Sequence, residues 1–489
     1  MTDTVASTLE ASTAAIDKPS LPDGLVAIVK SECATCQLTA PLLRRIPNLT
    51  VYTQDDPDFP PDVDAIHDAD LAVSWHHDIE TVPTLIKVVD GVEVERTVGW
   101  LRTDWQRITG IAHLGADLPE LRPGCGSMSV DPDKVDELRV RFTSGSLRAR
   151  RVELAQLEDE HEAMFDRGWT DGLPVVAPTE ERVLRMLEGT TRAPDDIVAV
   201  IPPDLVETTV EKVAIAAVMA GCLPEYLPWV LTAVEAVCND EFNMHGALAT
   251  TMPIGPVIVC SGPGTKAIGM NSEGNALGQG NRANLTIGRA VQLVVRNIGG
   301  GRPGEVDRAT HGNPGKLSFC FAERADSPIG FLAESRGATP GADALTVFAG
   351  EGPRCVVDQK SRDPHSLARS LAGSLRTVHH HKLPLGFDAI LVLGPEHARV
   401  FHGAGWDRQR ILDELHGLLQ LPVEEIVQGA GGIAEGIDPG ITASAVPKFA
   451  KDGILLAYAG GEAGLFSAII AGWVNGSTGS TPVTREVRR

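Results

Sequence analysis

Two cysteines three residues apart are the side chains of this sequence best suited to chemistry. Cys33 and Cys36 follow an apolar, β-branched run at 25–29 and precede helix-forming residues. This order predicts a strand that leads into the start of a helix. A helix N-terminus carries partial positive charge and unpaired N–H groups, which stabilise a thiolate. We therefore expect Cys33 to attack disulfides and Cys36 to resolve the mixed disulfide.

The elements that must position this dithiol follow in a compact pattern. Helices are expected at 36–45, 63–67 and 99–111, and a second strand is expected at 49–53. Two apolar strands around an Asp-Gly pair at 81–94 predict a β-hairpin, because that pair suits a turn with positive φ.

Residues 23–114 resemble a thioredoxin-fold domain. The resemblance rests on the Cys-Ala-Thr-Cys motif at 33–36 and on the Val-Pro-Thr motif at 82–84. It implies that Pro83 is cis, that it lies against the dithiol, and that the backbone near Val82 binds the substrate. The family often has Trp where this chain has Glu32. A carboxylate there would raise the pKa of the Cys33 thiol and weaken its activation.

The rest of the chain divides into three further parts. We expect a flexible leader at 1–22 and a connector at 115–164, which holds Cys125 in a turn before a charged helix. The glycines beside Cys125 leave its thiol open, which suits a third redox cysteine; an ordinary loop cysteine is the alternative.

Residues 165–489 are expected to form a larger domain that binds and converts the substrate. Short β-branched runs lie at 197–201, 257–260, 345–348, 390–393 and 454–458, and helical segments lie between them. This alternation predicts a layered α/β domain with a mostly parallel sheet and ligands at the carboxyl ends of its strands. A helix is expected at 465–470.

Two sets of residues in this domain could act as nucleophile and acid or base. Cys222 comes just before the expected helix that Pro224 opens, so it has the same electrostatic placement as Cys33. A buried apolar cysteine is the alternative. Cys320, His311 and Glu323 could supply a nucleophile, a general acid or base and an orienting group.

Carboxamides and glycines concentrate between 261 and 302. Carboxamides both donate and accept hydrogen bonds, so this stretch predicts a loop that holds a polar or carboxylate ligand at a helix N-terminus. Its candidate ligand-binding residues are Asn271, Asn275, Gln279, Asn281, Arg282, Asn284 and Arg289. The rival interpretation is a structural loop whose amides satisfy one another.

A glycine turn near the C-terminus is the last candidate ligand site. Gly460 and Gly461, with Ser467, could bind an anion or substrate. No βαβ unit can follow this turn, and the chain has no Gly-Lys-Ser/Thr phosphate loop. No nucleotide cofactor is therefore implied.

Most of 165–489 is similar to bacterial proteins labelled thioredoxin-like or thiol-disulfide isomerase, some of them related to the UGSC selenoproteins. The similarity is carried by the stretches 169–175, 220–222, 278–284 and 311–316. It implies homology but no particular reaction. The chain contains no selenocysteine and no UGSC tetrad, and the nearest sequence to that tetrad is Cys-Gly-Ser-Met at 125–128.

Charge and cysteine content narrow the partners and the location. The chain of 489 residues has 43 basic and 65 acidic side chains and a formal charge of −22, which opposes nucleic-acid binding. Eight cysteines are too sparse for a secreted disulfide scaffold, and no signal-peptide pattern opens the sequence. No apolar run reaches the roughly 20 residues that cross a bilayer. We expect a cytoplasmic protein without membrane contact.

The leading hypothesis is a thiol-dependent oxidoreductase or lyase that acts on a small polar substrate. In this hypothesis the dithiol of the thioredoxin-like domain reduces a disulfide formed in the second domain, and a thiol reductant then regenerates the dithiol. One alternative is a metal-dependent lyase or hydrolase with Cys, His and Glu ligands and a thioredoxin fold used only for docking. Another is a non-enzymatic dithiol protein that binds metal or a partner. The sequence assigns no metal ligands and no oligomeric state.

Overall fold

The computed structural model describes residues 18–143, 147–152, 154 and 158–488. The chain forms two compact units that divide after Leu147, called unit 1 and unit 2 below, and each is described by itself. Most of the leader predicted at 1–22 lies outside the described residues.

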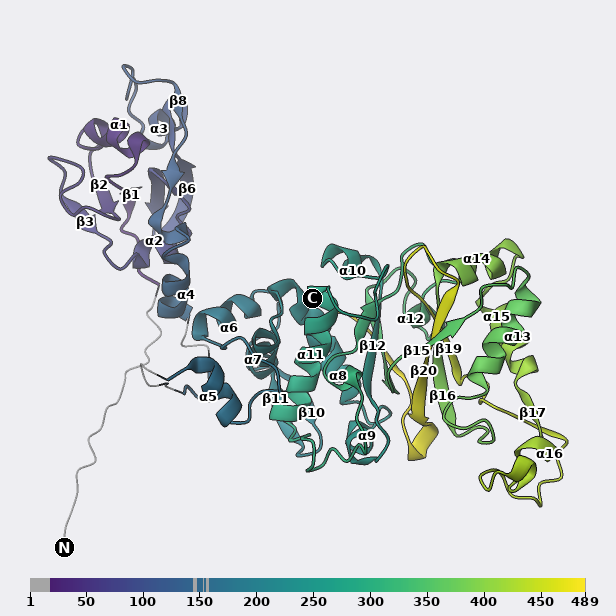
Figure 1. Cartoon of the computed structure of the whole chain (residues 1–489). Coiled ribbons are helices and arrows are strands. Elements are labelled where there is room, and N and C mark those ends of the chain that lie inside the picture. The colour runs from purple at the N-terminus through teal and green to yellow at the C-terminus, as the bar shows by residue number, and fades with distance from the viewer. Residues whose placement is uncertain (1–17, 144–146, 153, 155–157, 489) are drawn as a thin grey trace, which may run out of the picture. The chain divides into compact units, whose positions relative to one another are not determined.

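Unit 1 contains a five-stranded mixed sheet, made of β1 (Gly24–Val29), β2 (Leu49–Thr53), β3 (Ala65–His67), β5 (Thr84–Val89) and β6 (Val92–Val98). The strand order is β3-β2-β1-β5-β6, with β1, β2 and β3 parallel and β5 antiparallel to both of its neighbours. Figure 1 shows this sheet with its helices α1 (Ala34–Leu43), α2 (Ala72–His76) and α3 (Arg102–Thr109).

Most local predictions for unit 1 are confirmed. The strand at 49–53 is β2, and Asp90 and Gly91 both have positive φ in the turn between β5 and β6, as that turn requires. The helix predicted at 63–67 is wrong, because residues 65–67 pair with β2 as the edge strand β3. Such a short segment has little preference of its own, and the open edge of β2 decides its conformation.

The connector predicted at 115–164 is divided between the two units. Its first part belongs to unit 1, where β8 (Leu121–Arg122) pairs with β7 (Trp100–Leu101), and β9 (Cys125–Gly126) pairs with β4 (Thr81–Val82). The 3-10 helix η1 (Met128–Val130) and α4 (Val135–Thr143) follow in unit 1. In unit 2, α5 (Glu160–Asp166) contains the end of the predicted connector.

Unit 2 is also an α/β structure, as predicted, but its sheet is not mostly parallel. Six of its eight strands follow the order β13-β12-β14-β20-β16-β19; off this path, β15 pairs with β20 and β21 pairs with β14. Only β12 with β13 and β16 with β19 are parallel among the described pairs of this sheet. Its strands are β12 (Gly255–Ser261), β13 (Cys320–Ala322), β14 (Ala344–Gly350), β15 (Arg354–Val357), β16 (Phe387–Leu393), β19 (Ile454–Tyr458), β20 (Phe466–Val474) and β21 (Val483–Glu486).

The helix predicted at 465–470 is wrong, and this error explains part of the error in the sheet. Residues 466–474 form β20, which runs antiparallel between β14 and β16. A continuous apolar run fits a buried strand and a buried helix equally well, so only the pairing partners distinguish them. Because no helix crosses back between β19 and β20, the chain returns in the opposite direction.

Helices lie on both sides of this sheet (Figure 1). One group is α7 (Val210–Ala220), α8 (Leu227–Val237) and α11 (Arg282–Asn297), and the other is α13 (Pro364–Leu375), α14 (Pro395–Gly403) and α15 (Arg408–Leu418). Along β16, Leu391 and Leu393 join the core under α13, α14 and α15. Ile390 and Val392 join a second core, which includes Val257 and Val259 of β12 and Phe348 of β14. This alternation is the period of two expected of a strand buried on both faces.

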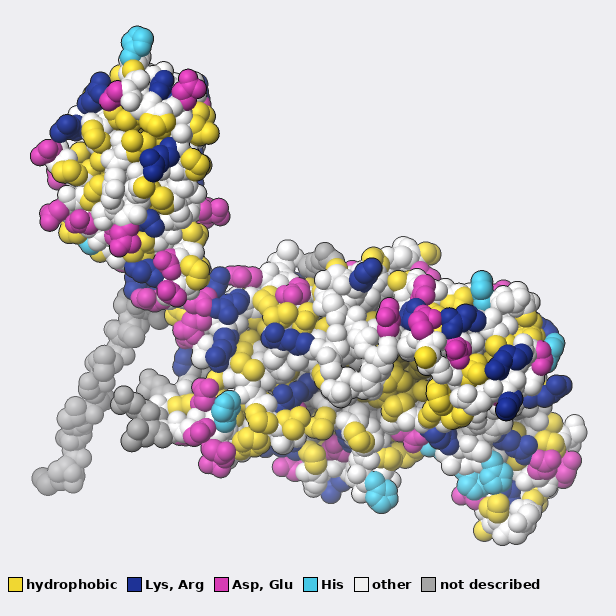
Figure 2. Space-filling view, turned by 45° about the horizontal axis from the view of Figure 1, so that its top comes forward, with side chains coloured by type: hydrophobic (Ala, Val, Ile, Leu, Met, Phe, Trp, Pro, Cys, Tyr) yellow, Lys and Arg dark blue, Asp and Glu magenta, His cyan; other side chains and the backbone are white. Residues whose placement is uncertain are grey.

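Shorter elements connect these layers. They are α6 (Glu180–Leu187), the hairpin of β10 (Ile197–Ile201) and β11 (Val206–Thr209), η3 (Pro224–Tyr226), α9 (Met244–Ala249), α10 (Pro263–Ala267), η4 (Pro314–Lys316), α12 (Leu332–Ser335), β17 (Gln420–Pro422), α16 (Val423–Ile426), η5 (Ala430–Gly432), β18 (Ala445–Pro447) and η6 (Gly476–Thr478). None of the helices in the described ranges has the length and apolar character needed to cross a bilayer. On the face drawn in Figure 2, basic side chains are scattered among acidic ones.

Candidate functional site

The dithiol of unit 1 lies where β1 leads into α1. Cys33 is the N-cap of α1, and its sulfur accepts a hydrogen bond from the N–H of Cys36 at 3.2 Å. Asp55 holds the preceding turn, because its carboxylate accepts the N–H groups of Ser31 at 2.7 Å and of Glu32 at 3.0 Å. The predicted strand, turn and helix start therefore place Cys33 at the helix N-terminus.

The two thiols of this site have opposite acidities. A hydrogen bond from the Cys36 thiol lowers the pKa of Cys33 to about 5, although burial opposes this shift. Burial and the neighbouring Cys33 raise the pKa of Cys36 far above its ordinary value. The weakened activation expected from Glu32 is wrong, because its side chain is exposed and the pKa of Cys33 is lowered. Cys33 is thus the sulfur that is ionised near neutral pH.

The loop at Val82 and Pro83 lies against the dithiol, as expected. The Val82–Pro83 peptide is cis, and the Val82 carbonyl oxygen lies 3.4 Å from the Cys33 sulfur. Cys125 also joins this site, since β9 pairs it with Val82, the residue whose carbonyl oxygen contacts the Cys33 sulfur. Burial raises the pKa of Cys125, and the negative charge of Cys33 adds to this effect.

The predicted activation of Cys222 in unit 2 is wrong. Its side chain is buried, and burial raises its pKa to about 12 despite its position before η3. The Cys320 sulfur lies 3.7 Å from that of Cys260, and both are buried in the sheet. For Cys222, burial outweighs the Thr286 hydrogen bond and the Arg282 charge, both of which lower its pKa.

The structure does not gather His311, Cys320 and Glu323 into one site. His311 lines a cleft, whereas Cys320 and Glu323 are buried and are not among the residues that line it. Burial raises the pKa of Glu323 to about 7, and its carboxylate accepts the N–H groups of Leu332 at 2.8 Å and of Tyr458 at 3.3 Å. Glu323 therefore joins β13 to α12 and β19.

Many side-chain amides of the carboxamide loop hydrogen-bond to other residues of the same loop. Asn281 caps α11 by accepting the N–H of Asn284 at 3.0 Å and donates to Gly269 O. The Asn284 side chain accepts from the N–H of Asn271 at 3.0 Å and donates to Asn271 O at 2.8 Å. Asn275 donates to Gln279 O at 2.5 Å. Arg282 donates to Gly221 O at 2.8 Å. These contacts match the structural alternative, and ligand binding by the loop stays a prediction.

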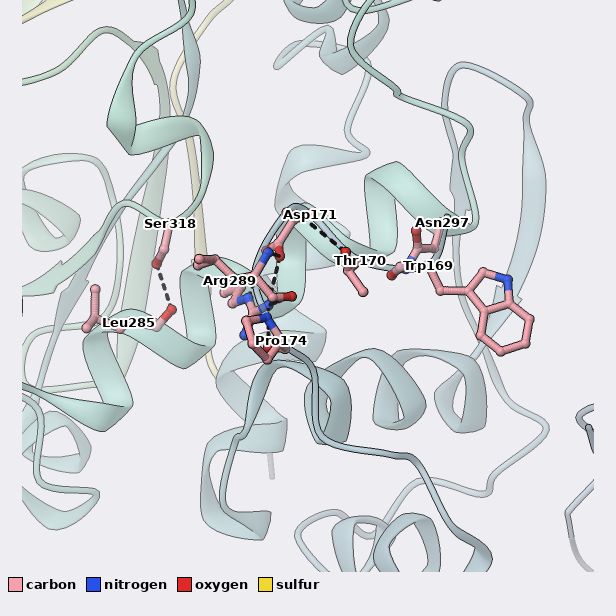
Figure 3. A network of polar contacts seen from close by, with 10 residues as sticks. Trp169, Thr170, Asp171, Pro174, Leu285, Arg289, Asn297 and Ser318 are labelled. Carbon is pink, nitrogen blue, oxygen red and sulfur yellow. Dashed lines mark hydrogen bonds and ion pairs between the residues drawn. The ribbon is translucent and has the colours of Figure 1, made fainter. Parts of the chain in front are cut away.

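Arg289 forms a partly buried ion pair that the sequence did not indicate (Figure 3). Its Nε and Nη2 donate to the two carboxylate oxygens of Asp171 at 2.7 and 2.8 Å, and Nη2 also donates to Pro174 O at 3.0 Å. Burial opposes ionisation of Asp171, but the guanidinium outweighs it, so the pKa of Asp171 is lowered. This pair fixes the 169–174 turn on α11.

A cleft of about 510 Å³, called the Arg296 cleft here, lies beside this ion pair. It is lined by Asp171, Gln292, Arg296, His311, Asn313 and Lys316, among others. Lys316 is paired with Asp307 at 2.7 Å. Arg296 Nε and Gln292 Nε2 are buried and have no acceptor within the described residues. Arg289 and Arg296 are seven residues apart on α11, a spacing that places both on one face and that could have revealed this cleft.

A second cleft, of about 430 Å³, brings together candidates that are far apart in the sequence. Its lining includes Asn275, Gly460, Gly461 and Ser467. Ser467 Oγ lies 2.8 Å from Nδ1 of His397, a buried histidine that the sequence did not indicate.

No group of three or more His, Cys, Asp or Glu residues in the described ranges is placed to hold a metal ion. Comparison with models of protein families gives no match for this chain. Comparisons with curated proteins and with solved structures give none either.

Proposed function

We propose that this chain is a thiol-disulfide oxidoreductase of thioredoxin type, in which Cys33 is the attacking sulfur. The observation that carries the proposal is the placement of the Cys33 sulfur at the N-cap of α1, 3.2 Å from the N–H of Cys36. That placement accompanies a pKa of about 5. Thiolate character at a helix N-terminus is the usual property of a reactive dithiol.

The reaction balances within the two cysteines. The Cys33 thiolate attacks one sulfur of a disulfide, the S–S bond breaks, and the leaving thiolate takes a proton. Cys36 then loses its proton and attacks Cys33, which releases the second thiol and leaves a Cys33–Cys36 disulfide. The high pKa of Cys36 keeps it protonated until that step. A thiol reductant must then restore the dithiol.

The test is reduction of a small chromogenic disulfide by the reduced chain, compared with Cys33→Ser. Cys355→Ser is the matched control, because Cys355 is an exposed cysteine of unit 2. We expect Cys33→Ser to lose at least tenfold in the rate of steady-state turnover, measured with a thiol reductant present, and Cys355→Ser to keep the wild-type rate. A Cys33→Ser chain that reduces the probe at the wild-type rate would overturn the proposal.

A second candidate function belongs to unit 2, where the Arg296 cleft supports binding of a small oxyanion such as a carboxylate or phosphate. Arg296 Nε and Gln292 Nε2 are donors without an acceptor within the described residues. Buried donors without partners are uncommon, so an oxyanion at the guanidinium is the natural complement. The form of the leading hypothesis that we retain is reduction by the dithiol of a disulfide whose carrier is bound in this cleft through its carboxylate or phosphate. The covalent link between the two units raises the local concentration of the reductant.

Thermal stabilisation by inorganic phosphate and by citrate tests this binding. We expect Arg296→Gln to abolish the stabilisation. The control is Arg369→Gln, which removes the same charge from an exposed position on α13. Equal stabilisation of the wild type and Arg296→Gln would contradict the assignment. A cytoplasmic location fits both functions, because the eight cysteines are free and a reducing compartment keeps them so.

A further inference from the structure

The segment that contains Cys125 lies along the edge of the loop before Pro83. In the pairing of β9 with β4, Cys125 is opposite Val82 and Gly126 is opposite Thr81. Farther along, the N–H of Ser127 donates to Glu80 O at 2.9 Å. Val82 is also the residue whose carbonyl oxygen lies 3.4 Å from the Cys33 sulfur. The chain's own strand thus occupies the backbone edge beside the reactive sulfur.

Close packing holds this segment in place. Thr35, in the first turn of α1, donates through its hydroxyl to Pro123 O at 2.6 Å. A Cβ on Gly124 would lie 2.4 Å from Thr81 Cγ2 and 2.7 Å from Val82 O, so only glycine allows this approach. A Cβ on Gly99 would lie 2.7 Å from the N atom of Gly124. The segment is therefore held close to the dithiol by specific packing and hydrogen bonding.

The three sulfurs differ in their access to solvent. Cys33 and Cys36 are each 0% exposed, whereas Cys125 is only partly buried. Cys125 is paired with Val82, whose carbonyl oxygen lies 3.4 Å from the Cys33 sulfur, so Cys125 and Cys33 flank the same residue. A disulfide that arrives from solvent meets Cys125 before it meets Cys33.

We propose that the disulfide attacked by Cys33 is carried by Cys125 of the same chain, so that Cys125 is the sulfur that exchanges with an external small disulfide. The inference rests on the proposed thiol-disulfide function and names its immediate substrate. Because β9 fills the edge at Val82, an extended polypeptide cannot pair there while β9 is in place. The external substrate is therefore a low-molecular-weight disulfide, written RSSR below.

The steps balance without a further oxidant. Cys125 loses its proton and attacks RSSR, which gives Cys125–S–S–R and one RSH. The Cys33 thiolate then attacks the Cys125 sulfur, the bond to R breaks, and the second RS⁻ leaves and takes a proton. Cys36 finally attacks Cys33, which forms the Cys33–Cys36 disulfide and returns the Cys125 thiol. Two thiols of the chain are oxidised and RSSR is reduced to two RSH.

The test uses Cys36→Ser, which stops the sequence before its last step. Full-length Cys36→Ser is treated with oxidised glutathione, quenched with acid and digested for peptide mass mapping. We expect a Cys33–Cys125 disulfide and no glutathione retained on Cys33. If Cys36→Ser does not fold, Cys36→Ala takes its place. Glutathione retained on Cys33 would overturn the proposal.

The double variant Cys36→Ser/Cys125→Ser measures whether Cys125 is the point of entry. Serine keeps the segment in place without a sulfur, so we expect glutathione to add to Cys33 at least tenfold more slowly than the disulfide forms in Cys36→Ser. Cys36→Ser/Cys355→Ser is the control and should behave as Cys36→Ser. Undiminished modification of Cys33 in the Cys125→Ser background would reject the inference and leave the reactivity of Cys33, and with it the proposed function, intact. Loss of probe reduction in Cys125→Ser but not in Cys33→Ser would contradict both.

Discussion

The acidity of Cys33 gives the sharpest prediction, because one neighbouring thiol is its largest cause. Wild-type Cys33 has a pKa of about 5, and the hydrogen bond from Cys36 contributes most to lowering it. An ordinary thiol has a pKa of about 8.5, so its thiolate fraction falls roughly 75-fold between about pH 8 and about pH 6. With a pKa of about 5 the fraction falls by only about a tenth over the same interval.

The variants Cys36→Ala and Cys36→Ser separate the hydrogen bond from the rest of the site. Alanine removes the donor, so we expect the pKa of Cys33 to rise. Serine keeps an O–H donor, so we expect a smaller rise. The measurement is thiolate absorbance in the ultraviolet against pH, with Cys33→Ser subtracted to isolate this sulfur. A low-pH inflection that is the same in Cys36→Ala and in the wild type would refute the reasoning, because it would assign the acidity to the helix N-terminus alone.

Three further predictions concern unit 2. Arg289→Ala leaves the Asp171 carboxylate, which is 9% exposed, without its ion pair. We therefore expect the free energy of unfolding to fall by about 3–5 kcal/mol, and by less in Arg289→Lys. Equal losses in the two variants would contradict a role for the paired geometry. Glu323 has a folded pKa of about 7, against an ordinary value of 4.5. Between these pH values the native state holds a proton that the unfolded chain has lost. The free energy of unfolding therefore falls as pH rises from 4.5 to about 7, by on the order of 3 kcal/mol. Glu323→Gln should remove that part of the pH dependence in thermal unfolding, and an unchanged slope would reject the assignment. Cys222, with its pKa raised to about 12, should resist iodoacetamide in the folded chain at neutral pH, whereas exposed Cys355 should react; rapid labelling of Cys222 would show that burial does not control it.

Local sequence determined the elements around the dithiol. An apolar β-branched run, two cysteines and a helix-forming stretch predict where β1 ends and α1 begins, and the Asp-Gly pair predicts the turn after β5. These features depend on residues adjacent in the chain, whose backbone preferences act over a few positions. The placement of Cys33 at a helix start therefore follows from sequence order alone.

The sheet of unit 2 could not be read in the same way. An alternation of strands and helices fixes the elements but not the direction of a strand that returns without a crossover helix, and β20 is such a strand. Its apolar residues suit a helix as well as a strand, and its neighbours β14 and β16 come from distant parts of the chain. Only their pairing decides its conformation.

Tertiary structure also decided which thiols can react. Cys222 and Cys33 have the same sequence context before a helix, yet burial raises the pKa of one and a neighbouring thiol lowers the pKa of the other. By itself the sequence determined that Cys33 begins a helix and that Cys125 lies between glycines. The pairing of β9 with β4 places Cys125 opposite Val82 and near Cys33. Cys125 and Val82 are more than forty positions apart, so only the pairing of strand edges brings them together.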